Sequence, residues 1–324
     1  MKRRSVLGLS LLPALAAVPS GLLFAQMPGG RAIRMLVGFA AGGPTDVVAR
    51  LFAQQLTEVL GQPVIVENRP GAGSNIASAE AARAPGDGMT ILYNTAGLVI
   101  APALGEKISF NPIKDFAPVA LTTTTYLAIL VNPAVPARDA KSLIAYIKAN
   151  PGKVNFAVGG LGTTPHLAMA HLALQNDLKV NYVPYKGAAP AMADLVAGHV
   201  QMTIEPVNTM MPFVRDNRVR ALALLGPRRS AIAPDLPTYQ ESMGTPFEAS
   251  SWQGMVVPAS TPKEVIARLN AAVNKVLQDP ALSQRLAASG TEVLGGTSER
   301  YGAFLQSELV RWDKVVKDAG IKTS

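Results

Sequence analysis

The segment Phe39-Ala40-Ala41-Gly42-Gly43-Pro44-Thr45-Asp46 lies between an apolar, strand-like run and the start of a helix. A second segment with the same surroundings is Val158-Gly159-Gly160-Leu161-Gly162-Thr163-Thr164-Pro165-His166. Glycine allows the backbone to approach a ligand closely, and the first free N–H groups of a helix attract anions. Each turn is therefore able to hold a carboxylate or phosphate without a charged side chain. Two such turns predict a cleft with a binding wall on each side.

The segments around these turns favour an α/β fold with parallel-type sheets, because apolar runs alternate with helix-period segments from Ile33 onward. We expect a first strand at residues 34–40, followed by a helix that Thr45 or Asp46 caps and Gly61 ends. Further strands are expected at 64–66, 89–93, 127–131, 154–158, 180–184, 200–204, 220–225 and 254–257, and helices at 142–149 and 165–175. Thr261 is expected to cap a later helix, with Pro262 in its first turn.

The layout of the first strands and helices repeats from about residue 126, which predicts two lobes hinged about a cleft. Residues 226–246, which are rich in proline, are expected to form a loop. Ligands of parallel sheets bind at the carboxyl ends of the strands, where both glycine turns fall. The cleft is therefore the expected site.

The first 26 residues have the features of an export signal. Lys2, Arg3 and Arg4 form a basic start, residues 6–18 are apolar, and Ala25 is a small residue suited to cleavage. A membrane anchor is the alternative, but the apolar stretch is too short to span a bilayer. The arginine pair leaves the twin-arginine and the general secretion routes both open. The absence of cysteine suits an exported chain.

Composition indicates a globular protein of about two domains, since 48% of the 324 residues are hydrophobic and 16% are charged. The net charge of +8 falls to about +5 once the basic signal is removed. Lys and Arg are scattered and form no basic helix, so nucleic acid is not expected as a partner. A mild positive charge favours anionic solutes.

Catalytic and cofactor motifs are missing from the sequence. It has no Gly-x-Ser-x-Gly elbow, no Ser-x-x-Lys and no His-Glu-x-x-His, and Gly71-x-Gly73 lacks the rest of a dinucleotide fingerprint. His166 and His171 are five residues apart, a poor spacing for two ligands on one helix face, and we expect no metal and no cofactor. Lys186 and Glu205 each follow or end an expected strand, where they either face the cleft or are solvated.

Several segments resemble those of the tripartite tricarboxylate transporter substrate-binding proteins, the Bug or TctC family. The resemblance is carried by residues 37–50, 66–73, 84–88, 185–190, 251–254 and 261–262, and by Asp194, Leu195 and Gly198. It covers essentially the whole chain after the signal. It implies a two-lobed periplasmic binding protein of type II, with residues 27–123 plus 251–324 in one lobe and 124–250 in the other.

In that family a ligand carboxylate is held by main-chain amides and hydroxyls of the two turns, often with bridging waters. The resemblance implies these ligand-binding residues: Phe39, Gly42, Gly43, Thr45 and Asp46 on one side, Gly160, Leu161, Gly162, Thr163, Thr164 and His166 on the other, and in addition Asn75, Thr95, Ala96, Lys186 and Glu205. The chain departs from many relatives in having Ala40-Ala41 in place of a proline and Ile204-Glu205 in place of Phe-Asp. The identity of the acid therefore stays open.

The function implied by the resemblance is that of a monomeric, non-catalytic protein. It would capture a small organic-acid anion in the periplasm and hand it to the membrane permease subunits of a tripartite tricarboxylate transporter. The alternative is a periplasmic sensor whose loaded form docks on a receptor or signalling partner. An α/β enzyme is a third reading, and the missing motifs argue against it.

Overall fold

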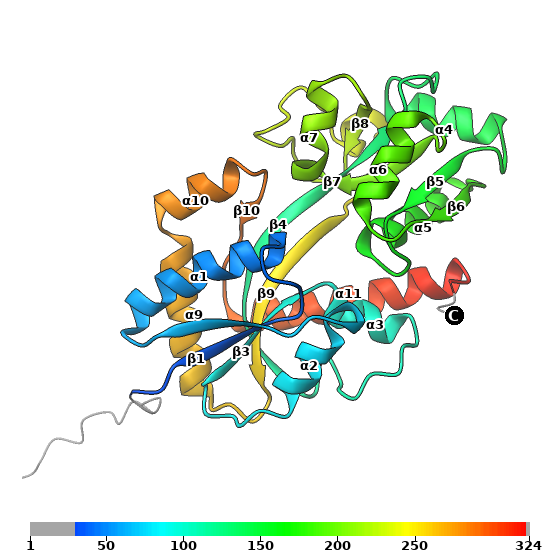
Figure 1. Ribbon diagram of the computed structural model, residues 1–324. Coiled ribbons are helices and arrows are strands. Elements are labelled where there is room, and N and C mark those ends of the chain that lie inside the picture. The colour runs from blue at the N-terminus through cyan, green and yellow to red at the C-terminus, as the bar shows by residue number, and fades with distance from the viewer. Residues whose placement is uncertain (1–29, 322–324) are drawn as a thin grey trace, which may run out of the picture.

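The computed structural model describes residues 30–321, so the expected signal at residues 1–26 lies outside the described part. Ten described strands form one sheet, in the order β2-β1-β3-β9-β4-β7-β5-β6, with β10 and β8 paired to β4. Figure 1 shows two groups of elements, with β4 and β9 running between them. No helix in the described part has the length and apolarity needed to cross a membrane.

The first part of the sheet contains both chain ends. Strands β1 (Ile33–Val37), β2 (Val64–Asn68) and β3 (Thr90–Thr95) are parallel, and β9 (Ser250–Pro258) lies antiparallel beside β3. The short strand β10 (Glu292–Val293) pairs with β4. The parallel arrangement brings the carboxyl ends of β1 and β3 to the same edge of the sheet.

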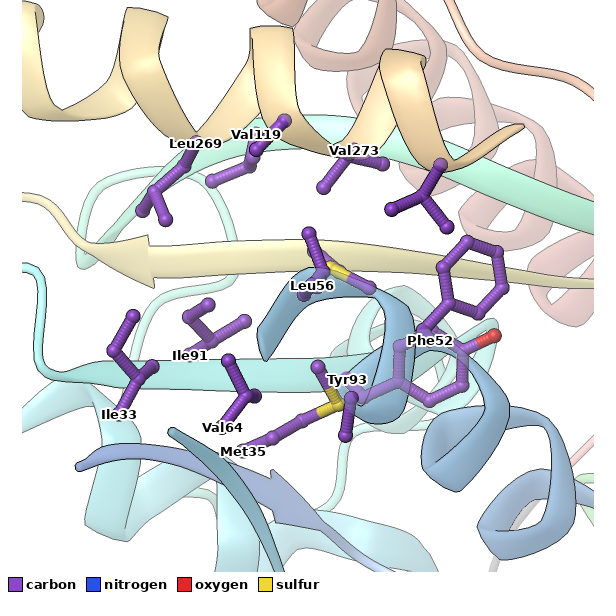
Figure 2. Packing of buried hydrophobic residues seen from close by; sticks show 14 of the residues in the cluster. Ile33, Met35, Phe52, Leu56, Val64, Ile91, Tyr93, Val119, Leu269 and Val273 are labelled. Atoms are coloured by element: carbon purple, nitrogen blue, oxygen red, sulfur yellow. The ribbon is translucent and has the colours of Figure 1, made fainter. Parts of the chain in front are cut away.

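Helices cover both faces of this part. The elements are α1 (Pro44–Leu60), α9 (Lys263–Leu277) and α10 (Pro280–Ala287) on one face, and η1 (Ala72–Ser74), α2 (Asn75–Ala82), α3 (Gly97–Ala103) and α11 (Ser298–Asp318) on the other. Figure 2 shows Phe52 and Leu56 of α1 and Val273 of α9 packed over buried strand residues such as Met35 and Tyr93. Burial of these side chains is the main force that fixes the helices on the sheet.

The second part of the sheet is built in the same way. Its strands are β5 (Asn155–Val158), β6 (Asn181–Pro184), β7 (Met202–Pro206), β8 (Arg220–Leu224) and the end of β4, and its helices are α4 (Ala140–Ala149), α5 (Thr164–Asn176), α6 (Ala188–Ala197), α7 (Val207–Arg215) and α8 (Tyr239–Met243). The strand β5 is parallel to β6 and β7. Helices α4, α5 and α8 pack in one cluster, and α6 and α7 pack in another.

The strand β4 (Phe116–Val131) belongs to both parts of the sheet. Residues up to Tyr126 pair with β9, and residues from Leu127 pair with β7 and β8. All of these pairings are antiparallel, so parallel strands within each part are joined by antiparallel ones. The boundaries expected at residues 123 and 250 stay predictions.

A further contact between the two parts lies beside α11. Leu167 and Ala170 of α5 are buried in the same apolar cluster as Trp312 and Val315 of α11. Helix α5 therefore begins at the second glycine turn and packs, one turn later, on the C-terminal helix.

Several sequence expectations were wrong in detail. The first strand ends at Val37 rather than at residue 40, and α1 has Gly43 rather than Thr45 or Asp46 as its N-cap. Pro44 explains this start, because its fixed φ angle suits the first helical position. Helix α9 likewise has Pro262 as its N-cap rather than Thr261. The expected loop at 226–246 contains the short helix α8, which a capping box formed by Thr238 and Glu241 stabilises.

The sequence also predicted only the last five residues of β4. Its earlier part contains Pro118 and the polar run Thr122–Thr125, which show no strand-like apolar pattern. All four threonines are buried, and the hydroxyl groups of Thr122, Thr123 and Thr125 have hydrogen-bond partners. Thr122 donates to the carbonyl of Gln253, and Thr125 bonds to Thr291.

Candidate functional site

The first glycine turn joins the carboxyl end of β1 to α1. Gly42 has a φ angle of 80°, in the left-handed region that favours glycine. Its N–H donates to the Asp46 carboxylate at 2.8 Å, which holds the turn against the first helical turn. Pro44 has no N–H, so the first free amides of α1 belong to Thr45 and Asp46, and neither has a hydrogen-bond acceptor among the described residues.

The second glycine turn joins β5 to α5 and repeats this geometry. Gly162 has a φ angle of 75°, and its N–H donates to Nδ1 of His166 at 3.0 Å. Thr163 is the N-cap and Pro165 lies in the first turn. The amides of Thr164 and His166 have no acceptor among the described residues. Both turns thus present helix N-termini with unused donors, which is the arrangement that suits an anion.

A cavity of about 320 Å³ lies between the two turns. Phe39 and Thr45 of the first turn and Leu161 to Pro165 of the second line it, together with residues around α3 and β9. Among the described residues that line the cavity there is no Lys, Arg or His, and Glu106 is the only ionisable side chain. Any anion bound here would be held by neutral donors.

Gln253 of β9 contributes one such donor. Its Oε1 accepts hydrogen bonds from the Tyr93 hydroxyl at 2.9 Å and from Thr123 Oγ1 at 3.1 Å. Tyr93 is fully buried, and burial raises the pKa of its hydroxyl, which therefore stays protonated as a donor. With Oε1 occupied, the amide nitrogen is the end of Gln253 that faces Thr45, whose Oγ1 lies 3.4 Å away. The buried hydroxyls thus fix the direction of the amide.

The cavity contains half of the sequence-predicted site residues. Those that line it are Phe39, Thr45, Thr95, Ala96, Leu161, Gly162, Thr163 and Thr164. Those that do not are Gly42, Gly43, Asp46, Asn75, Gly160, His166, Lys186 and Glu205. Their part in binding stays a prediction, and the contacts of several of them suggest a different task.

Asp46 and His166 stabilise the two turns by accepting hydrogen bonds from the N–H groups of Gly42 and Gly162. The Asp46 carboxylate also accepts from Arg50 at 2.9 Å and from Asn68 at 2.8 Å. Burial alone would raise the pKa of this carboxyl, but the bonds from Arg50, Gly42 and Asn68 lower it below its usual value. For His166, burial lowers the pKa, so the ring stays neutral and Nδ1 is able to accept.

The other three polar candidates lie apart from the cavity lining. Lys186 is exposed. Glu205 is buried at the end of β7 with no hydrogen-bond partner among the described residues, and burial raises its pKa to about 7. Asn75 donates to Glu106 at 2.8 Å and so touches the site through that carboxylate.

Sequence reasoning missed ten residues of the cavity lining, most of them in or just after α3 and in β9. These are Gly97, Ile100, Ala101, Leu104, Glu106, Ser251, Trp252 and Gln253, together with Gly73 of η1 and Pro165 of α5. Ile100 of α3 and Leu104, the C-cap of α3, are four positions apart and so lie on the same side of the helix. The sequence held one indication of this wall: an apolar run follows the strand expected at 89–93, at the carboxyl end of a parallel strand, where ligands bind.

Metal binding finds no support in the described residues, which contain no group of three His, Cys, Asp or Glu side chains placed to hold an ion.

Two helix-flanked sheet parts, joined by long crossing strands and separated by a cavity suited to an anion, define the class of periplasmic binding proteins. A solved structure of periplasmic binding protein BugD is 34% identical, with a TM-score of 0.74 over 91% of this chain and 99% of that one. A solved structure of an R. palustris protein with adipate is 32% identical, with a TM-score of 0.78 over 91% of this chain and 99% of that one.

The family follows from sequence comparison as well. Residues 48–321 match the model of the tripartite tricarboxylate transporter family receptor, TctC. Protein BugT of Bordetella pertussis is 35% identical over 320 residues, which cover 98% of this chain and 97% of that protein. The chain belongs to the TctC family of periplasmic solute-binding proteins, as the resemblance of its sequence segments predicts.

Proposed function

We propose that the protein captures a small carboxylate between its two glycine turns and delivers it to a tripartite tricarboxylate-type membrane transporter. The observation that carries this proposal is the cavity that both turns line, with unused amide donors and no cationic side chain. The adipate-bound relative supports a carboxylate as the ligand class. The family is one of solute-binding proteins, and we propose a non-catalytic role for this member also.

The carboxylate would be bound at the Thr45 end of the cavity. Thr45, with its free amide and hydroxyl, and the directed amide of Gln253 lie there, and Thr164, whose amide has no acceptor among the described residues, lines the cavity from the other turn. Neutral hydrogen-bond donors fixed in advance bind an anion well because they do not have to reorganise. In this proposal residues 27–123 plus 251–324 and residues 124–250 act as lobes that close on the ligand.

Residence in the periplasm would require export of the chain by residues 1–26. After cleavage we expect a monomer whose two lobes close over the acid, and whose closed form is the one that the permease subunits recognise.

Calorimetric titration with citrate, malate, adipate, hexanoate and benzoate tests this function. At least one acid should bind, it should be recovered unaltered, and the radius of gyration in small-angle scattering should fall on saturation.

The variant Gln253→Glu should lose about 100-fold in affinity, because it puts a carboxylate oxygen where the amide donates. Gln54→Glu is the matched control, since Gln54 is exposed on α1 and lines a different cavity. Binding of sugars or cations alone, or turnover of the acid, would contradict the proposal.

A further inference from the structure

The cavity is chemically different at its two ends. Thr95 is paired with Gln253 across β3 and β9, so the donor group of Thr45, Thr95 and Gln253 lies where α3 begins. Helix α3 then runs along the cavity for seven residues, which is about 10 Å. Glu106 follows its end and also lines the cavity. The donor group of Thr45, Thr95 and Gln253 therefore lies near one end of α3, and the carboxylate of Glu106 lies near the other.

The wall between these ends is apolar. Ile100 and Ala101 of α3 and Leu104 at its C-cap line it from one side, and Leu161 lines it from the second turn. Leu161 is 56% exposed although it is large and apolar. An apolar side chain at the surface of a cavity gains stability when a ligand covers it. These four residues suit a ligand with a hydrocarbon body.

Glu106 is held in place at the rim. Its Oε2 accepts from Asn75 Nδ2 at 2.8 Å, and the side chain is exposed. The next residue, Lys107, does not line the cavity. A second carboxylate on a bound acid would approach Glu106 with no cationic side chain among the described lining residues to offset the repulsion. Like charges placed together are a common means of rejecting a wrong ligand.

We propose that this cavity selects monocarboxylic acids with an apolar body over dicarboxylic acids of the same length, and that Glu106 supplies the discrimination. The inference rests on the proposed function, because it takes the carboxylate-binding end as given. The acid is placed with its carboxylate at Thr45 and Gln253, its hydrocarbon body along Ile100, Leu104 and Leu161, and its uncharged end toward Glu106.

Two matched pairs of acids test this selectivity: hexanoate against adipate, and benzoate against terephthalate. Calorimetry at low salt should show that each monoacid binds about tenfold or more tightly than its diacid. The ratio should shrink at 0.5 M salt, since the Debye length falls to about 4 Å and the rim charge is screened. Glu106→Gln should bring the ratio close to one by improving the binding of the diacid. Glu58→Gln is the control, because Glu58 is exposed and lines a different cavity.

The apolar wall is tested separately with Leu161→Ser, which removes an exposed side chain and leaves the core intact. Hexanoate should bind about five- to tenfold more weakly, with Val310→Ser as the control because Val310 is 70% exposed on α11. Equal or tighter binding of the diacids, or of malate or citrate alone, would overturn the inference and leave the proposed function standing. A ratio that Glu106→Gln does not change would overturn the role of Glu106. If no carboxylate binds, both proposals fail.

Discussion

The two glycine turns have nearly the same backbone conformation, but different side chains accept their hydrogen bonds. The N-cap residues Gly43 and Thr163 have φ, ψ angles of −72°, 165° and −76°, 161°. In each turn the third helical residue accepts a hydrogen bond from the glycine before the N-cap. In the first turn that acceptor is the carboxylate of Asp46, and in the second it is the neutral ring of His166.

This difference shows what the turn requires and what it leaves free. It requires an acceptor at the third helical position, which both residues provide. It does not require a charge. A carboxylate at a helix N-terminus already compensates part of the helix dipole, whereas a neutral imidazole does not. The first turn is therefore stabilised more strongly by its own side chain. The helix N-terminus at the second turn keeps more of its attraction for a bound anion.

The largest expected effect is on the stability of the first turn. Asp46→Ala should cost about 3 kcal/mol in the free energy of unfolding, because Gly42, Arg50 and Asn68 all donate to this buried carboxylate. His166→Ala should cost about 1–2 kcal/mol, since only one hydrogen bond and one ring are lost. Urea denaturation at pH 7 measures both. Equal costs would mean that the two turns are supported in the same way.

The next effect is on ligand affinity and separates Gly162 from Gly42. A Cβ added at Gly162 would lie 2.5 Å from Cδ1 of Leu104, whereas one added at Gly42 meets nothing within 4 Å. Both positions also have positive φ angles that disfavour Val. Gly162→Val should weaken binding of the best ligand about 100-fold, since it also pushes on α3 of the other sheet part, and Gly42→Val should weaken it about tenfold. Calorimetry on the two folded variants would reveal a reversed order if this reasoning fails.

A smaller effect concerns Glu205, a buried carboxyl that lacks the partners of Asp46. Its pKa of about 7 exceeds the ordinary value of 4.5, so the folded protein favours the neutral acid. Its contribution to stability is complete below pH 4.5, declines between pH 4.5 and 7, and is lost above pH 7. Glu205→Gln should remove this decline and stabilise the protein at pH 8 by about 2 kcal/mol. A variant that is no more stable at pH 8 than the wild type would show that Glu205 is solvated.

The smallest effect is the acid response of the second turn. Burial lowers the pKa of His166 below the ordinary 6.5, so its stabilising contribution is present above pH 6.5 and is lost as the pH falls through the folded pKa. His166→Asn should keep an acceptor for the N–H of Gly162. It should also reduce, by about 1 kcal/mol, the free energy of unfolding that is lost between pH 7 and pH 5. His171 is half-buried and its pKa is also lowered, so His171→Asn is measured alongside it. The melting temperature is measured across this pH range for both variants. The role of His166 would be refuted if only His171→Asn changed the dependence of the melting temperature on pH.

The sequence was sufficient for the parts of the fold that local patterns encode. Both glycine turns, the alternation of strands and helices and the family were predicted from it, because glycine, proline and apolar periodicity act over a few residues. The path of β4 was not predicted, since its buried threonines depend on partners such as Gln253 that lie far away in sequence.

The sequence named part of the cavity lining. Thr45, Leu161, Gly162 and Thr164 were named because they belong to the turns, and Thr95 and Ala96 were named through the family resemblance alone. The wall from α3 was missed, since a buried apolar helix and a helix that lines a cavity have the same pattern. The predicted roles of Asp46 and His166 as ligand-binding residues depend on which way a polar side chain points, and the sequence does not determine that direction.

The central claim is that one carboxylate lies between the two turns with its apolar body along α3. A crystal structure of the protein grown with 4-bromobenzoate tests it most directly, because bromine gives an anomalous signal that marks one end of the ligand. We expect the carboxylate at Thr45 and Gln253, within hydrogen-bonding distance of the second turn, and the bromine among Ile100, Leu104 and Leu161. A bromine peak outside this cavity, or a carboxylate turned toward Glu106, would contradict the account.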